Sequence, residues 1–257
     1  MAWGQLALAG AGLTAGLYIR SLNHAAQSVR AGLNPPLYIR EPRCRVSLCV
    51  PAYNESAYIR RLLISARNQT EPFAEIVVAD SSAPEEGTAD ITREYGGLVV
   101  PTYYGNVAAA RNAAAEASAG DVILFADADM TLSNRLVESV LNVLEQGYAC
   151  AHPRYLIDDS TPWSLITWPV YAFRTKSLTG GCVAVPRSVW DEIGGYDETC
   201  NPGLNWCRED LNFGYRIAMA YGKDALKILP DVVGISARRY YSYWGDKTFN
   251  PVRAKYA

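Results

Sequence analysis

The amino-acid sequence predicts an α/β fold in which helices flank a mostly parallel central sheet. Short apolar runs alternate with amphipathic stretches between residues 45 and 150, which is the pattern of repeated strand–helix–strand units. The chain has 257 residues, 49% of them apolar, and this is enough for one sizeable core. Polar residues follow several of the apolar runs, where the ends of parallel strands would meet.

The first 19 residues carry no charged side chain, and the first charge is Arg20. We expect residues 1–30 to form a hydrophobic helix that either associates with a membrane or packs on protein, in this chain or in a homo-oligomer. If the helix is in a membrane, Arg20 and Arg30 place the main domain on the cytoplasmic side; if it packs on protein, the chain is cytoplasmic. Residues 31–44 are rich in proline and arginine and are predicted to be a linker.

Four strands and three helices are predicted between residues 45 and 150. The strands are apolar and often β-branched, and they cover residues 46–50, 76–78, 97–101 and 122–125. Pro51 is expected to break the first strand. Each helix follows a residue whose side chain can cap its first turn, and these caps are Ser56, Asn106 and Ser133. The three helices are expected to run to about Asn68, Gly120 and Gly147.

The pattern is less regular after residue 150. We expect a strand over residues 180–185, a short helix from Pro186 to Gly194-Gly195, a helix from Glu209 to Tyr221, and strand-like segments over 225–235.

Charge and cysteine content narrow the classes of function. The formal net charge of −2 offers no electrostatic basis for nucleic-acid binding. The six cysteines include no Cys-x-x-Cys pair, so the spacing of a zinc site is absent. We expect most of them to be buried thiols in a reducing compartment, while Cys200 and Cys207 flank one loop and would pair in an oxidising one.

Asp127 and Asp129 are the most informative residues, because they end the apolar run of residues 123–126. Alternate residues of a strand point to the same face, so the two carboxylates leave the sheet together. Hard cations such as Mn²⁺ and Mg²⁺ prefer carboxylate oxygens and keep substrate phosphates as further ligands. A lone Asp-x-Asp pair is usually a solvated turn, so its meaning depends on what the other strand ends carry.

The other predicted strand ends also carry polar residues. Glu55 follows the first strand and can accept a hydrogen bond from a ribose, Asp80 follows the second, and Arg111 on the next helix can contact a base or phosphate. Glu209 and Asp210 begin a helix, where acids are ordinarily dipole partners but can also act as a general base.

Arg238 and Arg239 follow the last strand-like segment and could clamp a diphosphate or form an exposed basic turn. Gly180, Gly181 and Trp206 could contact a bound ligand, because glycine allows close approach and tryptophan can stack on a ring. A core position for Trp206 is the alternative.

These motifs together resemble family 2 glycosyltransferases of the GT-A fold. The matching stretches are residues 46–56, 76–82, 108–112, 125–129, 194–198, 209–210 and 236–239. The resemblance implies an inverting, metal-dependent hexosyltransferase that uses a nucleoside-diphosphate sugar such as a UDP- or GDP-sugar. It implies a GT-A domain over residues 45–257 with a nucleotide-binding half (45–150) and an acceptor half (151–257). The acceptor is expected to be a glycan or a lipid-linked sugar, and the lipid-linked alternative is suggested only by the N-terminal apolar run.

The resemblance also implies roles for most of these motifs. The donor nucleotide would contact Pro51, Tyr53, Glu55, Asp80, Arg111 and Asp127. Asp129, with Asp127 beside it, would bind Mn²⁺ or Mg²⁺. Asp210 would be the catalytic base and Glu209 the second choice. Gly180, Gly181 and Trp206 would lie on the acceptor side, where the tryptophan would stack on a sugar ring.

The chain departs from the family pattern at three places. The usual Asp-Asp-Gly-Ser after the second strand is here Ala79-Asp80-Ser81-Ser82. Neither His24 nor His152 stands where some GT-A enzymes have a metal-binding histidine. The long membrane-embedded C-terminal region of polysaccharide synthases is also missing, which argues against a processive polymer exporter.

Three other functions compete with an inverting transferase. A nucleotidyltransferase would need a glycine-rich basic loop after the first strand, where this chain has Asn54-Glu55-Ser56. A non-catalytic nucleotide-sugar-binding protein would not need the full set of acids. A retaining transferase of the same fold differs in the anomer of its product.

Overall fold

The structure is a computed structural model and describes residues 2–103, 105–157, 181–200, 208–236 and 238. The strands are β1 (Val46–Ala52), β2 (Glu75–Asp80), β3 (Leu98–Pro101), β4 (Val122–Phe125), β5 (Met130–Thr131), β6 (Cys150–Ile157), β7 (Val183–Pro186) and β8 (Leu226–Ile235). The helices are α1 (Ala2–Ala31), α2 (Ile59–Arg67), α3 (Thr88–Glu94), α4 (Val107–Glu116), α5 (Leu136–Leu144), α7 (Arg187–Ile193) and α8 (Glu209–Tyr221), with short 3₁₀ turns η1 (Pro84–Glu86) and η2 (Lys223–Ala225).

All of these strands belong to one sheet with the order β3-β2-β1-β4-β7-β6-β8-β5. The first four strands along the chain pair in parallel, as the sequence predicts. Their carboxyl ends therefore lie at one edge of the sheet. Strand β7 pairs antiparallel to β4 and β6, β8 runs parallel to β6, and β5 pairs antiparallel to β8.

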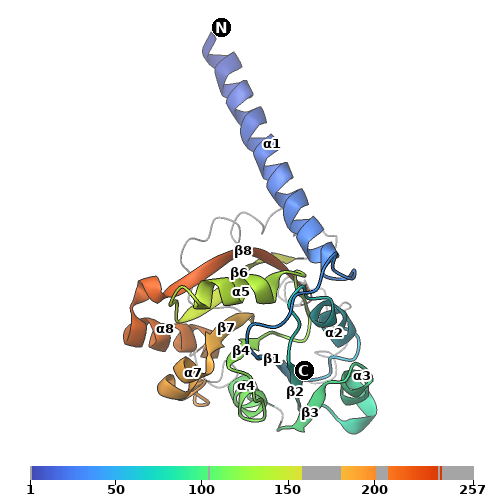
Figure 1. Cartoon of the computed structure of the whole chain (residues 1–257). Coiled ribbons are helices and arrows are strands. Elements are labelled where there is room, and N and C mark those ends of the chain that lie inside the picture. Colours follow the sequence, from blue (N-terminus) through green and yellow to red (C-terminus); the bar gives the residue numbers. More distant parts are fainter. Residues whose placement is uncertain (1, 104, 158–180, 201–207, 237, 239–257) are drawn as a thin grey trace.

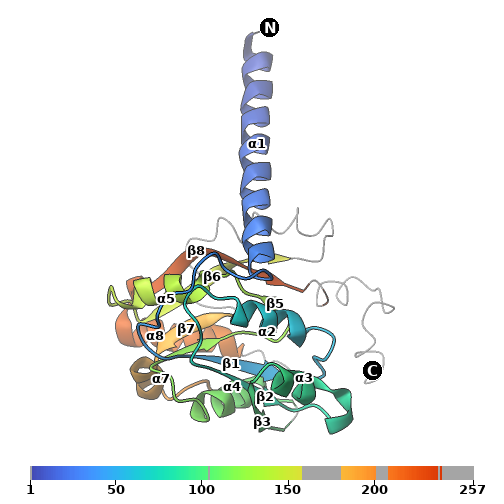
Figure 2. The same ribbon diagram turned by 45° about the vertical axis from the view of Figure 1, so that its right-hand side comes forward.

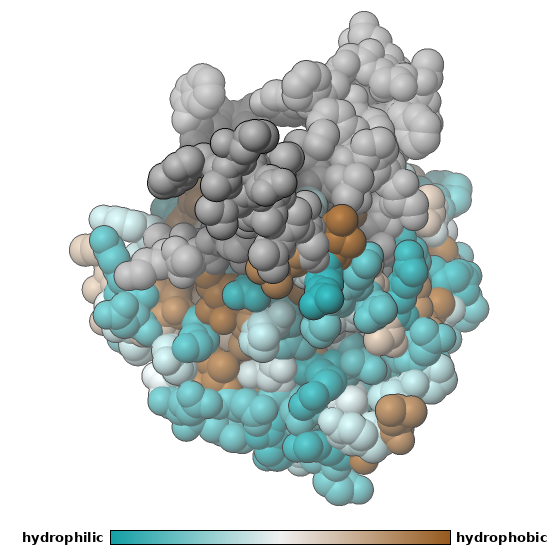
Figure 3. Space-filling view, turned by 90° about the horizontal axis from the view of Figure 1, so that it is seen from above, coloured by the Kyte–Doolittle hydropathy of each residue, from teal (hydrophilic) through white to brown (hydrophobic). Residues whose placement is uncertain are grey.

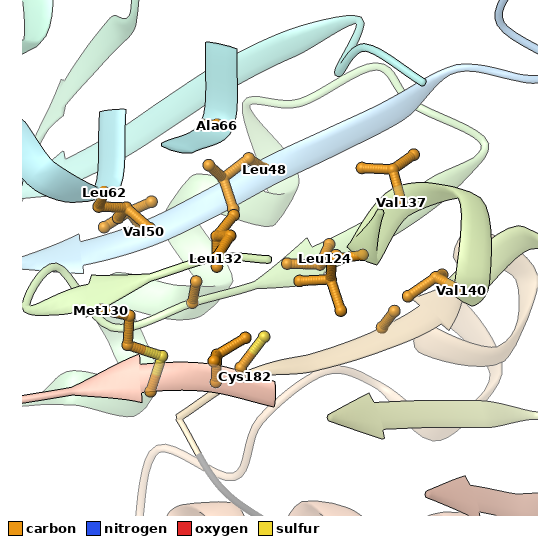
Figure 4. Packing of buried hydrophobic residues seen from close by; sticks show 14 of the residues in the cluster. Leu48, Val50, Leu62, Ala66, Leu124, Met130, Leu132, Val137, Val140 and Cys182 are labelled. Atoms are coloured by element: carbon orange, nitrogen blue, oxygen red, sulfur yellow. The ribbon is translucent and has the colours of Figure 1, made fainter. Parts of the chain in front are cut away.

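Helices cover both faces of this sheet (Figure 1). On one face, Leu48 and Val50 of β1 pack with side chains of α2 and α5, such as Leu62 and Val137 (Figure 4). On the other face, β1 contributes Cys49 to a second cluster, which includes side chains of α4, α7 and α8. This alternation along β1 is the period of two expected for a strand buried on both faces.

Helix α1 projects from the domain, and its C-terminal part lies on the sheet (Figures 1 and 2). Ala25 and Val29 are fully buried there against Leu156 of β6 and Val232 of β8. No helix in the described part of the chain has both the length and the hydrophobicity needed to cross a membrane. The expected N-terminal helix is present, and its C-terminal part packs on strands β6 and β8 of the same chain.

Three local predictions for the first half are wrong. Strand β1 continues through Pro51, which pairs with Ala79 of β2. The pairing of β1 with β4 ends at Cys49, so Pro51 lies where the missing N–H costs no bond to β4. Ser56 and Ser133 do not cap α2 and α5, which begin at Ile59 and Leu136.

Both serines are hydrogen-bonded to an acidic residue, and for Ser133 this bond uses the hydroxyl that was expected to cap α5. The N–H of Ser56 donates to Oε1 of Glu86 at 2.9 Å, and the hydroxyl of Ser133 donates to Asp231 at 2.9 Å. The Asn106 cap is confirmed, because its side chain accepts from the N–H of Ala109 at 3.1 Å. Helix α4 nevertheless ends at Glu116, before Gly120.

The second half is partly as predicted. Helix α8 has the predicted bounds, Glu209–Tyr221, and both Gly194 and Gly195 after α7 have positive φ. Strand β6 was not predicted, because Pro153 and charged Arg154 interrupt its apolar run. Cys49, Cys150 and Cys182 are buried free thiols as expected, and Cys44 is a half-buried free thiol. Cys200 is disulfide-bonded, and Cys207 lies outside the described residues.

Candidate active site

The turn after β1, the loop after β4 and the residues after β8 meet at Arg238. Its Nη2 donates to Oε1 of Glu55 at 2.5 Å, and its Nε donates to Oδ2 of Asp129 at 2.8 Å. The guanidinium also lies 4.5 Å from the centroid of the Tyr58 ring. One side chain thus joins two predicted site residues that are 74 positions apart in the sequence.

The turn that carries Glu55 is held by the segment between β2 and α3. Asn54 has a positive φ of 54° and donates its N–H to Oγ of Ser82 at 2.7 Å. The N–H of Glu55 donates to Oγ1 of Thr88 at 2.9 Å. Thr88 begins α3, which the sequence pattern does not predict, and the part that Thr88 plays in placing Glu55 is therefore visible only in the structure.

Glu55 is buried in an acidic environment. Its Oε2 is buried and has no hydrogen-bond partner among the described residues. Burial is the main cause that raises the pKa of Glu55 to about 7; Arg238 opposes the rise, while Asp129 and Asp127 add to it. A buried carboxylate oxygen without a partner is costly, so this atom is suited to accept a hydrogen bond from a ligand.

Asp80 is the last residue of β2 and is buried. Its Oδ1 accepts from the N–H of Ser82 at 2.9 Å and from the Ser82 hydroxyl at 2.6 Å. The Ala-Asp-Ser-Ser departure from the family pattern therefore builds a local turn at the end of this strand. Pro51 and Tyr53, in β1 and the turn after it, are half-buried.

Arg111 forms the second link of the site. Its Nη2 donates to Oδ1 of Asp127 and its Nη1 to Oε1 of Glu209, both at 2.8 Å. The guanidinium is buried and lies 5.2 Å from the centroid of the Tyr196 ring. The expected contact of Arg111 with a nucleotide base remains a prediction, since these described contacts are all within the protein.

Asn112 holds the Tyr196 backbone in place beside Arg111. Its Oδ1 accepts from the N–H of Tyr196 at 2.8 Å, and its Nδ2 donates to the Tyr196 carbonyl and to Oε1 of Glu198, both at 2.9 Å. The Tyr196 ring stacks on Phe213 with centroids 4.1 Å apart. The sequence predicts Gly194-Gly195 only as the end of a helix; their positive φ values turn the chain so that Tyr196 reaches Asn112.

Gly181 lies directly against Asp127, in the loop that carries the candidate metal ligands Asp127 and Asp129. A Cβ atom at this position would overlap the carboxylate of Asp127 and would press on the Met130 side chain. The neighbouring Cys182 is fastened by Tyr155, whose hydroxyl donates to the Cys182 carbonyl at 2.9 Å and accepts from its N–H at 3.1 Å. Gly180, Trp206 and Arg239 lie outside the described residues.

The two acids at the start of α8 have different surroundings. Glu209 is buried and bound to Arg111. Asp210 accepts from the N–H of Leu211 at 2.8 Å and lies 3.4 Å from Nη2 of the exposed Arg208. Glu209 is therefore paired with the buried Arg111, whereas Asp210 has the exposed Arg208 as its cationic neighbour.

The described residues fit a divalent cation that takes most of its ligands from a substrate. No group of three or more His, Cys, Asp and Glu side chains in the described ranges could hold a metal alone. Within the described residues, Arg111 and Arg238 join the carboxylates of Glu55, Asp127, Asp129 and Glu209. The oxygen donors of these carboxylates are hard ligands, and they suit Mn²⁺ or Mg²⁺ bound with a diphosphate and water.

Residues 47–187 match the sequence model of the family described as Glycosyl transferase family 2. An uncharacterized glycosyltransferase of Haemophilus influenzae is 32% identical over 102 residues, which cover 39% of this chain and 35% of that protein. The match thus spans about a third of that relative's length.

Two solved structures show the same fold at low sequence identity. GalNAc-T7, solved with UDP, GalNAc and Mn²⁺, has a TM-score of 0.58 and 21% identity and covers 75% of this chain and 43% of its own. The mannosyltransferase PcManGT of Pyrobaculum calidifontis, solved with GDP-Man and Mn²⁺, has a TM-score of 0.57 and 20% identity. The likeness covers 91% of this chain and 69% of that chain. The predicted GT-A type of α/β fold is confirmed by this likeness.

Proposed function

The chain belongs to glycosyl transferase family 2, and from this membership we propose that it moves a hexose from a nucleoside-diphosphate sugar to an acceptor hydroxyl with inversion. One observation carries the proposal. Arg238 and Arg111 connect the carboxylates that follow β1 and β4 and that begin α8 into one acidic site. A site of this kind can hold a nucleotide, a cation and a base around one sugar.

The donor is proposed to be a UDP- or GDP-sugar, in keeping with the UDP and GDP-Man of the two similar structures. Oε2 of Glu55 is the atom best placed to accept a hydrogen bond from the donor's ribose, since it is buried without a partner in the described part of the chain. Pro51, Tyr53, Asp80 and Arg111 are assigned to the nucleotide on the family resemblance.

Asp129 is proposed as the main metal ligand, with Asp127 beside it. A bound Mn²⁺ or Mg²⁺ would neutralise the charge that grows on the diphosphate leaving group. Arg238 and Arg239 are proposed to stabilise the same charge from the protein side.

Asp210 is proposed as the general base. Its carboxylate takes the proton of the acceptor hydroxyl as the oxygen attacks the anomeric carbon from the face opposite the diphosphate. Arg111 already binds Glu209 at 2.8 Å, so this carboxylate is engaged within the protein. Glu209 therefore serves to hold Arg111, and it is the second choice for the proton.

The acceptor is proposed to be a glycan or a lipid-linked sugar that approaches beside Gly181, with Gly180 and Trp206. We propose that α1 associates with the cytoplasmic face of a membrane; packing against a second copy of the chain is the alternative. Seen from the side of α1, the described surface is mostly hydrophilic with scattered apolar residues (Figure 3). Flotation of the full chain with anionic vesicles and sedimentation without vesicles separate the two arrangements.

A donor screen tests the function itself. The full chain is mixed with UDP- and GDP-sugars, with and without Mn²⁺, and the released nucleoside diphosphate is measured. We expect release with one donor class, increased by Mn²⁺ and by an acceptor. Binding without release under all conditions would instead indicate a nucleotide-sugar-binding protein. The anomer of the product, determined by NMR, separates inversion from retention.

A further inference from the structure

Arg238 holds the carboxylate that the proposed function assigns to the metal. Its Nε donates to Asp129 at 2.8 Å while its Nη2 donates to Glu55 at 2.5 Å. The exposed fractions of the three side chains are 19% for Arg238, 10% for Glu55 and 7% for Asp129. These are largely buried ion pairs, in which charges interact more strongly than at the surface.

A divalent cation bound through Oδ2 of Asp129 would meet the guanidinium at close range. Two positive charges a few ångström apart repel each other strongly in a site that excludes water. Arg238 also covers Glu55, whose remaining oxygen is buried without a partner among the described residues. The cation and Arg238 therefore compete for the same carboxylates.

We infer that Arg238 is the resident counter-cation of Asp129 and Glu55 in the donor-free protein, and that it must leave Asp129 before a metal ion binds. This inference rests on the proposed function, because the diphosphate of a nucleoside diphosphate is the anion that would bind the Arg238 guanidinium after it leaves Asp129. The diphosphate offers the displaced guanidinium a new anionic partner and supplies ligands to the metal. Metal and nucleotide then bind with positive coupling, and each raises the affinity for the other by the same factor.

The test measures Mn²⁺ binding to the full chain by the EPR signal of free Mn²⁺, without nucleotide and with UDP or GDP. We expect Arg238→Gln to raise the Mn²⁺ affinity of the nucleotide-free protein at least tenfold and to reduce the coupling with nucleotide. Arg238→Lys keeps the charge and should stay closer to the wild type. Arg60→Gln is the matched control, because Arg60 pairs with Glu94 at the surface.

Arg238→Gln leaves Glu55 without its cation and could disturb folding, so its thermal melt is compared with that of the wild type. The double variant Glu55→Gln/Arg238→Gln removes one charge of each sign and should also bind Mn²⁺ more tightly than the wild type. Asp129→Asn should abolish the gain in either background.

Equal Mn²⁺ affinity in the wild type and both Arg238→Gln variants would overturn the inference, and so would weaker binding in the variants. The proposed function fails on a different readout, which is the absence of nucleoside diphosphate release with every donor. A tenfold gain in Mn²⁺ affinity without any such release would support the role of Arg238 and refute the transferase proposal.

Discussion

Gly181 and Asp127 are packed so closely that a single additional carbon atom at Gly181 would overlap the Asp127 carboxylate. Asp127 is also bound to Arg111 at 2.8 Å. A shift of the Asp127 carboxylate would therefore disturb the loop proposed to bind the metal. It would also disturb the start of α8, because Arg111 pairs with both Asp127 and Glu209.

The first prediction concerns this contact. Gly181→Ala should lower kcat/KM at least tenfold and the free energy of unfolding by about 1–3 kcal/mol, because the methyl group overpacks a buried site. Donor turnover and urea unfolding measure the two effects. Gly147→Ala is the control, since this glycine has a φ of 89° with no neighbouring atom within 4 Å; it should cost about 1 kcal/mol without changing turnover. A fully active Gly181→Ala enzyme would contradict the assigned role.

The second prediction separates the two acids of α8. Asp210→Asn should reduce kcat by a factor of about 10²–10⁴ while the Kd of the donor stays within a few-fold, because only the proton acceptor is lost. Glu209→Gln should instead lower stability, since it weakens a buried pair with Arg111. Single-turnover kinetics and isothermal titration of the donor measure these effects. Near-normal turnover in Asp210→Asn would show that the base lies elsewhere.

The third prediction concerns the metal. Asp129→Ala should abolish the increase of turnover with Mn²⁺, because Asp129 is the proposed protein ligand that remains once the substrate supplies the others. A Mn²⁺ titration of donor turnover measures this effect. Asp121→Ala is the control, because Asp121 is an exposed aspartate paired with Arg45. A Mn²⁺ response that survives in Asp129→Ala would place the metal on other residues.

The fourth prediction concerns pH. The pKa of Glu55 is raised from 4.5 to about 7, chiefly by burial. The protonated form is therefore favoured in the folded state, and this contribution to stability is complete below pH 4.5 and is lost as pH rises through about 7. The stability of the metal-free wild type, relative to Glu55→Gln, should fall by about 1–3 kcal/mol between pH 4.5 and 8. Parallel pH profiles for the two proteins would refute the raised pKa.

The fifth prediction concerns Asn112, which holds the Tyr196 backbone beside Arg111. Asn112→Ala should destabilise the protein by about 2–4 kcal/mol, because it leaves the buried N–H and carbonyl of Tyr196 without partners. Donor turnover should fall as well, since Tyr196 lies over Arg111. Asn142→Ala is the matched control, because Asn142 accepts an exposed hydrogen bond from Arg43; it should cost less than about 0.5 kcal/mol. Thermal unfolding of both variants checks the difference.

Much of the sheet could be predicted because its signals are local. Strand β4 was predicted over residues 122–125 from a short apolar run, and α8 was predicted from Glu209 to Tyr221 with Gly222 as its stop. Strand β6 and helix α3 were missed because their segments lack a clear apolar period. Ser56 and Ser133 were assigned as caps on local chemistry, but each serine is hydrogen-bonded to a distant acidic residue instead.

The sequence by itself determined which residues carry the site's charges and which strand ends present them, since these properties depend on neighbours along the chain. Only the tertiary structure decided which charges meet. Arg111 and Glu209 are 98 positions apart, and Arg238 and Glu55 are 183 apart. Whether such groups form ion pairs depends on how helices and loops pack around the sheet, and burial then strengthens the pairs that form. The two arginines were therefore predicted as ligand contacts, whereas in the folded chain they hold its carboxylates.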